Sequence, residues 1–131
     1  MKNKRVVKKI NWQNIVTIFL AIFGIILIFS FIDYLIHSLK EAFAVPDYYF
    51  RNKIIFGAIW GFVVYLLIKR FKISLFVKSL IFSAAISIVL QFRYYLEGYP
   101  KDFVFLFLGI HFVILFIVSL VSFKLIEKFK L

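Results

Sequence analysis

The chain of 131 residues contains no cysteine, two prolines and six acidic residues. Without cysteine it can form no disulfide, zinc–thiolate site or thiol redox centre, so the quinone-coupled dithiol enzymes of membranes are excluded. The two prolines, Pro46 and Pro100, leave long stretches in which nothing interrupts a helix. The few acids face 17 lysines and arginines, which gives a net charge of +11. The position of this charge therefore needs an explanation.

Hydrophobic residues make up 64% of the sequence. They form four apolar stretches, at about residues 15–36, 49–68, 73–90 and 103–123. Each stretch is long enough for a helix that crosses the roughly 30 Å hydrocarbon core of a bilayer. We therefore expect an all-α integral membrane protein, a single four-helix bundle over residues 1–131 that begins with a basic arm at residues 1–11.

The basic residues are distributed unevenly along the chain. Twelve lie in the N-terminal arm, around the second connection and at the C-terminus, whereas five lie in the first and third connections. Because Lys and Arg are enriched on the cytoplasmic side, we expect an up-down-up-down chain in the plasma (cytoplasmic) membrane with both termini cytoplasmic. The basic cytoplasmic rim should attract anionic lipid headgroups. Nucleic acid is not an expected partner, because these residues have no folded surface outside the membrane.

Small residues mark the helix faces that we expect to pack inside the bundle. Gly57 and Gly61 are four residues apart in the second stretch. In the third stretch, serines recur every four residues at Ser79, Ser83 and Ser87. Residues four apart lie on one helix face, and small side chains let membrane helices approach closely. These spacings favour packing within the chain over a dimer interface.

Polar side chains gather toward the outer ends of the four stretches. Asp33 and His37 are four residues apart and share a helix face, and His111 lies within the fourth stretch. A charge at membrane depth costs a few kcal/mol, so its presence indicates a partner or a function. The residues that we expect at an outer ligand-binding site are Asp33, His37, Arg51, Gln91, Arg93 and His111.

Three interpretations of these polar residues remain open. In the first, Asp33 pairs with one of Arg51, Lys53 and Arg93, of which Arg93 and Arg51 are the expected partners. In the second, a solvated pocket open to the outer side binds an anionic ligand or headgroup. The third is a metal site, for which the residue types are suitable but the spacing forms no tight motif. Its weak candidates are Asp33, His37, Glu41 and His111.

No cofactor and no catalytic constellation are expected from the sequence. The two histidines should differ in depth by about 10 Å, because His37 ends its stretch and His111 lies eight residues inside the fourth. This separation argues against a haem held between them.

The layout resembles one family of small membrane proteins. The resemblance rests on the acid–xxx–His end of the first stretch, on the run Gly-Phe-Val-Val-Tyr at 61–65 before a basic turn, and on Arg93, Pro100 and Asp102. In these features the chain is similar to the phosphate-starvation-inducible E (PsiE) family. Members often carry an acid within the second span, and this chain has none there. The resemblance implies a four-helix membrane fold rather than an activity.

Two classes of function are compatible with the sequence. The first is a non-enzymatic bundle that binds lipid or a partner membrane protein, as an accessory subunit, a homo-oligomer or part of a larger membrane complex. The second is a small transporter, flippase or intramembrane enzyme that uses a polar pocket open to the outer side. The lack of a catalytic motif favours the first class.

Overall fold

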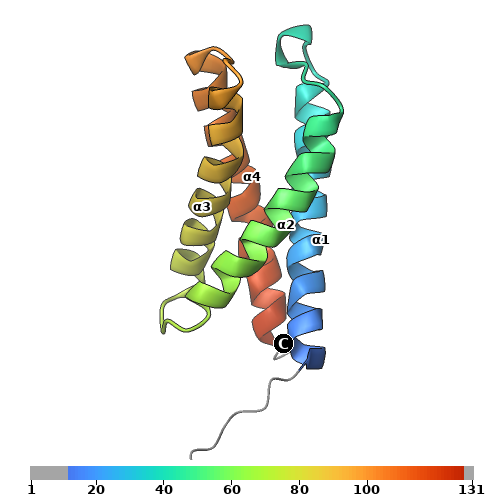
Figure 1. Cartoon of the computed structure of the whole chain (residues 1–131). Helices are drawn as coiled ribbons and strands as arrows, with labels where there is room; N and C mark the ends of the chain where they lie inside the picture. The colour runs from blue at the N-terminus through green and yellow to red at the C-terminus, as the bar shows by residue number, and fades with distance from the viewer. Residues whose placement is uncertain (1–11, 129–131) are drawn as a thin grey trace, which may run out of the picture.

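The structure, a computed structural model, describes residues 12–128 as four long helices and one short 3-10 turn (Figure 1). The helices are α1 (Trp12–His37), α2 (Tyr48–Ile68), α3 (Leu75–Leu96) and α4 (Lys101–Lys128), and the turn η1 (Glu41–Phe43) follows α1. No strand occurs within this range, so the expected all-α class is confirmed there. All four helices are long and apolar enough to cross a membrane. The predicted basic arm at 1–11 lies outside the described residues.

The third predicted span differs most from the structure. Helix α3 begins two residues later and ends six residues later than the predicted range 73–90. At its start, the Ser74 side chain accepts a hydrogen bond from the backbone N–H of Val77, an N-cap that fixes the first turn. At its end, Gly98 takes a positive φ of 84° and the N–H of Tyr99 donates to the carbonyl of Tyr94. This pairing ends the helix as a Schellman motif does.

The connections are divided between the two ends of the bundle (Figure 1). In this view the α1–α2 and α3–α4 connections lie at the top, whereas the α2–α3 connection and the last turn of α4 lie at the bottom. We call the end that carries residues 38–47 and 97–100 the two-loop end. Helix α2 runs obliquely across the bundle, and α1 packs against both α2 and α4.

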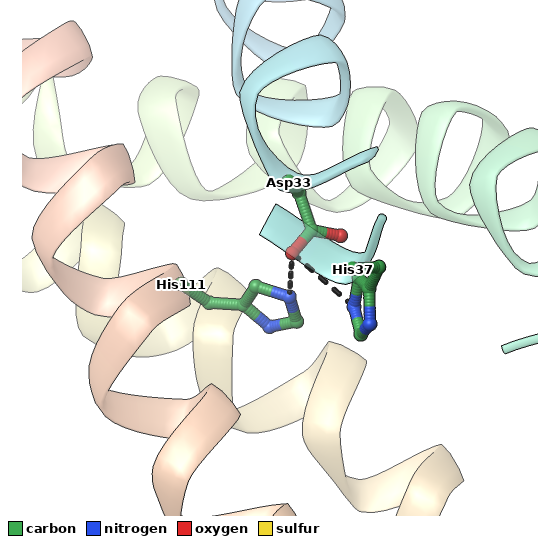
Figure 2. A group of neighbouring side chains, drawn as sticks. All are labelled: Asp33, His37 and His111. Atoms are coloured by element: carbon green, nitrogen blue, oxygen red, sulfur yellow. Dashed lines mark hydrogen bonds and ion pairs between the residues drawn. The ribbon is translucent and has the colours of Figure 1, made fainter. Parts of the chain in front are cut away.

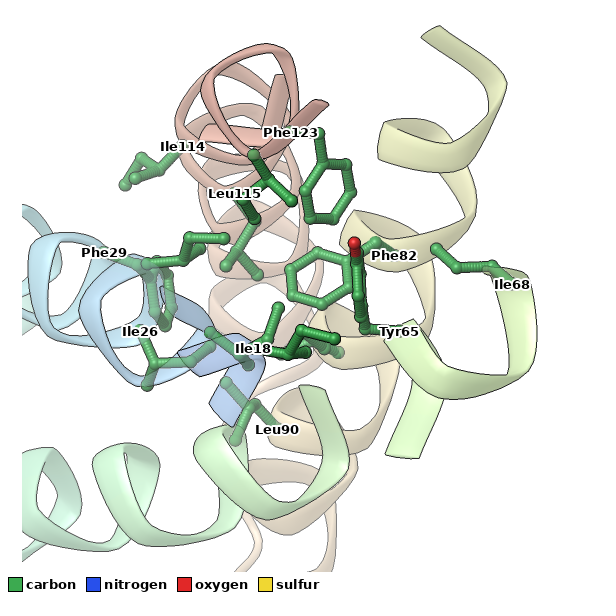
Figure 3. Packing of buried hydrophobic residues seen from close by; sticks show 14 residues of the cluster. Ile18, Ile26, Phe29, Tyr65, Ile68, Phe82, Leu90, Ile114, Leu115 and Phe123 are labelled. Carbon is green, nitrogen blue, oxygen red and sulfur yellow. The ribbon is translucent and has the colours of Figure 1, made fainter. Parts of the chain in front are cut away.

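An apolar core fills the bundle between the helices (Figure 3). Phe82 and Phe123 lie edge to face with ring centroids 5.1 Å apart, and Tyr65 packs against Phe123 at 5.3 Å. The outward faces of the helices are also apolar, with large side chains such as Phe105 and Ile88 mostly exposed. In a membrane these faces contact lipid, so the polar groups inside the bundle become the informative exceptions.

The small residues of α2 and α3 lie on inward faces. A Cβ atom added at Gly57 would lie 3.1 Å from the Ile26 side chain, and one at Gly61 would lie 3.0 Å from Ile22. The two glycines therefore let α2 approach α1 closely, as small residues do between membrane helices. The serines at four-residue spacing in α3 are also buried, at Ser79, Ser83 and Ser87.

Replacing Gly61 with leucine should destabilise the bundle by about 1–3 kcal/mol, because the new side chain has to displace Ile22 and Ile86. Gly109→Leu is the matched control, since Gly109 is exposed on α4 and its added Cβ meets nothing within 4 Å. Both changes gain the same helix propensity. Thermal unfolding in detergent should separate them, and equal midpoints would contradict the close approach at Gly61.

Candidate functional site: a buried charged cluster

A charged cluster lies inside the bundle near its two-loop end. Asp33, on the last turns of α1, is fully buried, and its Oδ2 accepts a hydrogen bond from the Nζ of Lys53 on α2 at 2.5 Å. Lys53 itself is only 4% exposed. An ionised pair at membrane depth is unfavourable unless each charge is compensated. Each charge of this pair therefore needs further polar or charged neighbours inside the bundle.

Two histidines meet the other oxygen of the same carboxylate (Figure 2). The Nε2 of His111, on α4, lies 2.9 Å from Asp33 Oδ1, and the Nε2 of His37 lies 3.4 Å from it. Both Nε2 atoms also face Lys53 Nζ, at 3.3 and 3.4 Å. Asp33, His37 and His111 are each buried. The cluster thus joins a carboxylate, an ammonium group and two imidazoles.

The second nitrogen of each imidazole has its own partner. The Nδ1–H of His37 donates to the backbone carbonyl of Phe43 at 2.6 Å, because a carbonyl can only accept. The short turn η1 brings this carbonyl over the end of α1. The Nδ1 of His111 is hydrogen-bonded to the side-chain amide of Gln91 on α3. All four helices therefore contribute to the cluster, which we call the Asp33 cluster: Asp33, His37, Lys53, Gln91 and His111.

Aromatic rings enclose these groups. Phe107 stacks on His37 with ring centroids 4.1 Å apart and planes at 4°. Lys53 Nζ lies 4.9 Å from the centre of the Tyr94 ring and 5.4 Å from that of Phe50. A ring face attracts a cation by up to about 2 kcal/mol when both are desolvated. The rings therefore exclude water and help to compensate the ammonium charge.

Two hollows approach the cluster from different sides. The first, which we call the α2–α3 groove, has a volume of about 150 Å³ and is lined at one point by Lys53. The second has a volume of about 290 Å³, lies beside η1, and is lined by His37 together with polar residues such as Lys40, Glu41 and Asp47. The cluster is therefore buried but has a neighbouring hollow on each side.

The structure brings together four of the six residues expected at the site, namely Asp33, His37, Gln91 and His111. Of the three basic residues considered as partners of Asp33, Lys53 is the one that pairs with it, and the two preferred ones, Arg93 and Arg51, are wrong. Arg93 instead pairs with Glu97 at 3.1 Å and lies over the Tyr49 ring, and Arg51 is exposed on α2.

Three of the four weak metal candidates, Asp33, His37 and His111, lie together, and Glu41 does not. Glu41 is exposed in η1 and is not among the three residues whose ligand atoms converge. The expected difference in depth between His37 and His111 is wrong, because both contact one oxygen of Asp33. Helix α4 begins ten residues before His111, about 15 Å further toward the two-loop end, whereas α1 ends at His37 and is followed by η1. The start of α4 therefore extends beyond the end of α1, whereas the prediction assumed that both lie at the same depth.

Lys53 was considered from the sequence only as a possible partner of Asp33 and was not among the residues expected at the site. A signal for it was present, because Lys53 precedes Gly57 and Gly61 at the same four-residue spacing. A face expected to pack inward thus carried a lysine at its outer end. Arg51, two residues away, points to the other side of the helix.

Removing one partner of the ion pair should destabilise the protein by about 3–5 kcal/mol, because the other charge stays buried without compensation. We expect this loss for Asp33→Leu and for Lys53→Met in detergent with EDTA, which keeps stray metal from replacing the missing cation. The double variant should recover most of the stability. Arg93→Met is the control, with a loss of about 0–1 kcal/mol for its half-exposed pair. Additive losses in the double variant would show that the two charges are not coupled.

Comparison with known proteins assigns no relative to this chain. No family model matches it, no curated protein matches it, and no solved structure matches it. The function has therefore to be argued from the geometry of the Asp33 cluster and of the two hollows beside it.

Proposed function

We propose that the protein is a small, non-enzymatic membrane protein that binds an anionic phospholipid in the α2–α3 groove. The observation that carries this proposal is the lining of the groove, which is largely apolar and includes Asn52, Lys53 and Arg93 toward the two-loop end. Asn52 and Arg93 lie at that end, near the start of α2 and on the last turn of α3. Phe56, Trp60 and Val89 line the apolar part.

The position of the groove supports a lipid as its occupant. Phe56, Trp60 and Val89 are between 38% and 47% exposed, on helix faces that a membrane-spanning bundle presents to hydrocarbon. A hollow between such faces is filled by acyl chains. A headgroup at the two-loop end would meet the guanidinium of Arg93, which retains donors beyond its one bond to Glu97. Planar guanidinium groups bind phosphate well.

Filling the groove should displace the lipid. Val89→Phe puts a ring into the apolar lining, whereas Ile88→Phe puts the same ring on the adjacent position, which is 59% exposed and does not line the groove. Native mass spectrometry should show severalfold less bound phospholipid for Val89→Phe, with unfolding midpoints alike in both variants. Equal lipid retention in the two proteins would contradict the proposal.

The headgroup contact is tested with a second matched pair. Arg93→Gln should lower the preference for phosphatidylglycerol over phosphatidylcholine by about fivefold, since one well-placed charge contributes about 1 kcal/mol. Arg51→Gln removes the same charge from the same end of the bundle but from outside the groove. An equal effect of the two changes would indicate diffuse attraction rather than a site.

We further propose that the protein is an up-down-up-down bundle in the cytoplasmic membrane, with both termini cytoplasmic and the two-loop end outside. The uneven distribution of lysine and arginine supports this orientation. Lys69, Arg70 and Lys72 are exposed around the α2–α3 connection. On the cytoplasmic side they would form a rim that attracts anionic headgroups.

The orientation can be tested by labelling, because the chain has no cysteine of its own. Single cysteines at Ser38 and Lys101 should react with an impermeant thiol reagent in intact, right-side-out cells. A cysteine at Lys72, on the opposite connection, should react only after permeabilisation. The reverse pattern would overturn the assignment.

A small transporter, flippase or intramembrane enzyme is the second candidate. The observation in its favour is the hollow beside η1, which places polar residues next to His37 and therefore next to the Asp33 cluster. Buried ionisable groups in membranes often mark substrate or proton pathways. A ligand that loses affinity on change of Asp33 but not of Val89 would favour this candidate.

Membership in the PsiE family and assembly into a homo-oligomer or larger membrane complex remain predictions.

A further inference from the structure

We propose that Asp33, His37 and His111 form a binding site for a divalent transition-metal ion of the zinc class. Their ligand atoms all lie within 4.8 Å of one another, and all three residues are buried. Two imidazole nitrogens and one carboxylate oxygen suit zinc, cobalt or iron better than magnesium or calcium. None of the three residues lines the α2–α3 groove, although Lys53, which contacts all three, does.

The spacing of the ligand atoms fits one ion. Asp33 Oδ1 lies 2.9 Å from His111 Nε2 and 3.4 Å from His37 Nε2. In a tetrahedral zinc site with bonds of about 2.0–2.1 Å, neighbouring ligand atoms lie about 3.3 Å apart. The two distances from Asp33 Oδ1 to the histidine nitrogens are thus already close to this value. The remaining distance, between the ligand nitrogens of the two histidines, is at most 4.8 Å, so a small movement of one ring would bring them close enough.

The outer partners of the histidines are those of metal ligands. A metal-binding histidine almost always donates its second N–H to a nearby acceptor, which fixes the ring and its tautomer. His37 does so through Nδ1–H to the Phe43 carbonyl at 2.6 Å. This leaves its Nε2 lone pair aimed at Asp33 and Lys53.

Gln91 can play the same part for His111. Among residues 12–128, the Oε1 of Gln91 is buried without a hydrogen-bond partner, while the amide nitrogen faces His111 Nδ1. A half-turn of the amide exchanges Oε1 and Nε2, which have nearly the same size and position. Turning the amide lets Oε1 accept from an Nδ1–H and frees the Nε2 lone pair for a metal ion. In that orientation the oxygen gains a partner, and the amide nitrogen becomes the unpaired atom.

Lys53 marks where the cation binds. Its ammonium lies 2.5 Å from Asp33 Oδ2 and 3.3 to 3.4 Å from both Nε2 atoms, so it faces the same three groups that a metal ion would use. Two cations cannot share these acceptors at such distances. Metal binding therefore requires the ammonium to withdraw, and the α2–α3 groove that Lys53 lines provides the adjacent space. The ion and Lys53 are alternative cations of one site.

The chain suits a direct test, because His37 and His111 are its only histidines and it has no cysteine. The protein would be purified through a histidine-free tag in neutral detergent, stripped with EDTA, exposed to one equivalent of Zn²⁺ and desalted. Elemental analysis should find close to one zinc ion per chain in the wild type and in Glu41→Gln, whose carboxylate is exposed. His111→Ala should lose the zinc. A wild type that retains no more zinc than His111→Ala would overturn the proposal.

A measurement on the wild type alone covers the case in which His111→Ala fails to fold. Co²⁺ in a four-coordinate site gives strong visible absorption, whereas Co²⁺ bound loosely through water gives weak bands. We expect the strong spectrum, removed by one equivalent of Zn²⁺. Weak bands only would contradict the site.

Two further variants test the roles of Gln91 and Lys53. Gln91→Ala should weaken zinc binding roughly 10–100-fold, as loss of an outer partner of a ligand does. Lys53→Met removes the competing cation and should bind zinc more tightly than the wild type, with a rise in its unfolding temperature on zinc addition. Zinc binding by Lys53→Met together with none by the wild type would show that Lys53 is the permanent cation and that the proposal is wrong.

Discussion

The ion pair between Asp33 and Lys53 is the constraint on which the two-loop half of the molecule depends. At 2.5 Å it joins α1 to α2, and the remaining carboxylate oxygen draws in His111 from α4. Through His111 the constraint reaches Gln91 on α3. Mutual attraction alone rarely compensates the desolvation of a buried pair, so these additional hydrogen bonds are needed. A single carboxylate thus fixes the relative positions of all four helices at one depth.

The two halves of the bundle are specified by different forces. Lipid tails are as apolar as leucine, so apolar side chains alone give membrane helices little reason to choose one packing over another. Further from the two-loop end, complementary shape determines how α1 packs on α2, because Gly57 and Gly61 leave room for Ile26 and Ile22. At the two-loop end, an error in register would leave Asp33 or Lys53 without a partner. Polar groups therefore determine the register there, at the expense of their own desolvation.

The sequence was sufficient for the four apolar helices and for four of the five residues in the Asp33 cluster. Four apolar runs predicted the four helices, and a four-residue spacing placed Asp33 and His37 on one face, because both signals are local. The partner of Asp33 was not local. Arg93 pairs instead with Glu97, four residues further along the chain at the end of α3, and does not reach Asp33. The meeting of the two histidines depends on the stagger of α1 and α4, which no single helix encodes.

The choice of lysine at position 53 follows from the shape of the cluster. An ammonium group is a compact charge with three donors on a flexible stem, whereas a guanidinium is a planar fork. Atoms of three different groups lie 2.5 to 3.4 Å from Nζ, which suits a compact charge better than a planar one. A small metal ion meets the same requirement. Because Lys53 also lines the α2–α3 groove, an occupant of the groove and a cation in the cluster would act on the same side chain. Lys53 is the one residue that the groove lining and the Asp33 cluster share, so any coupling between the two would pass through it.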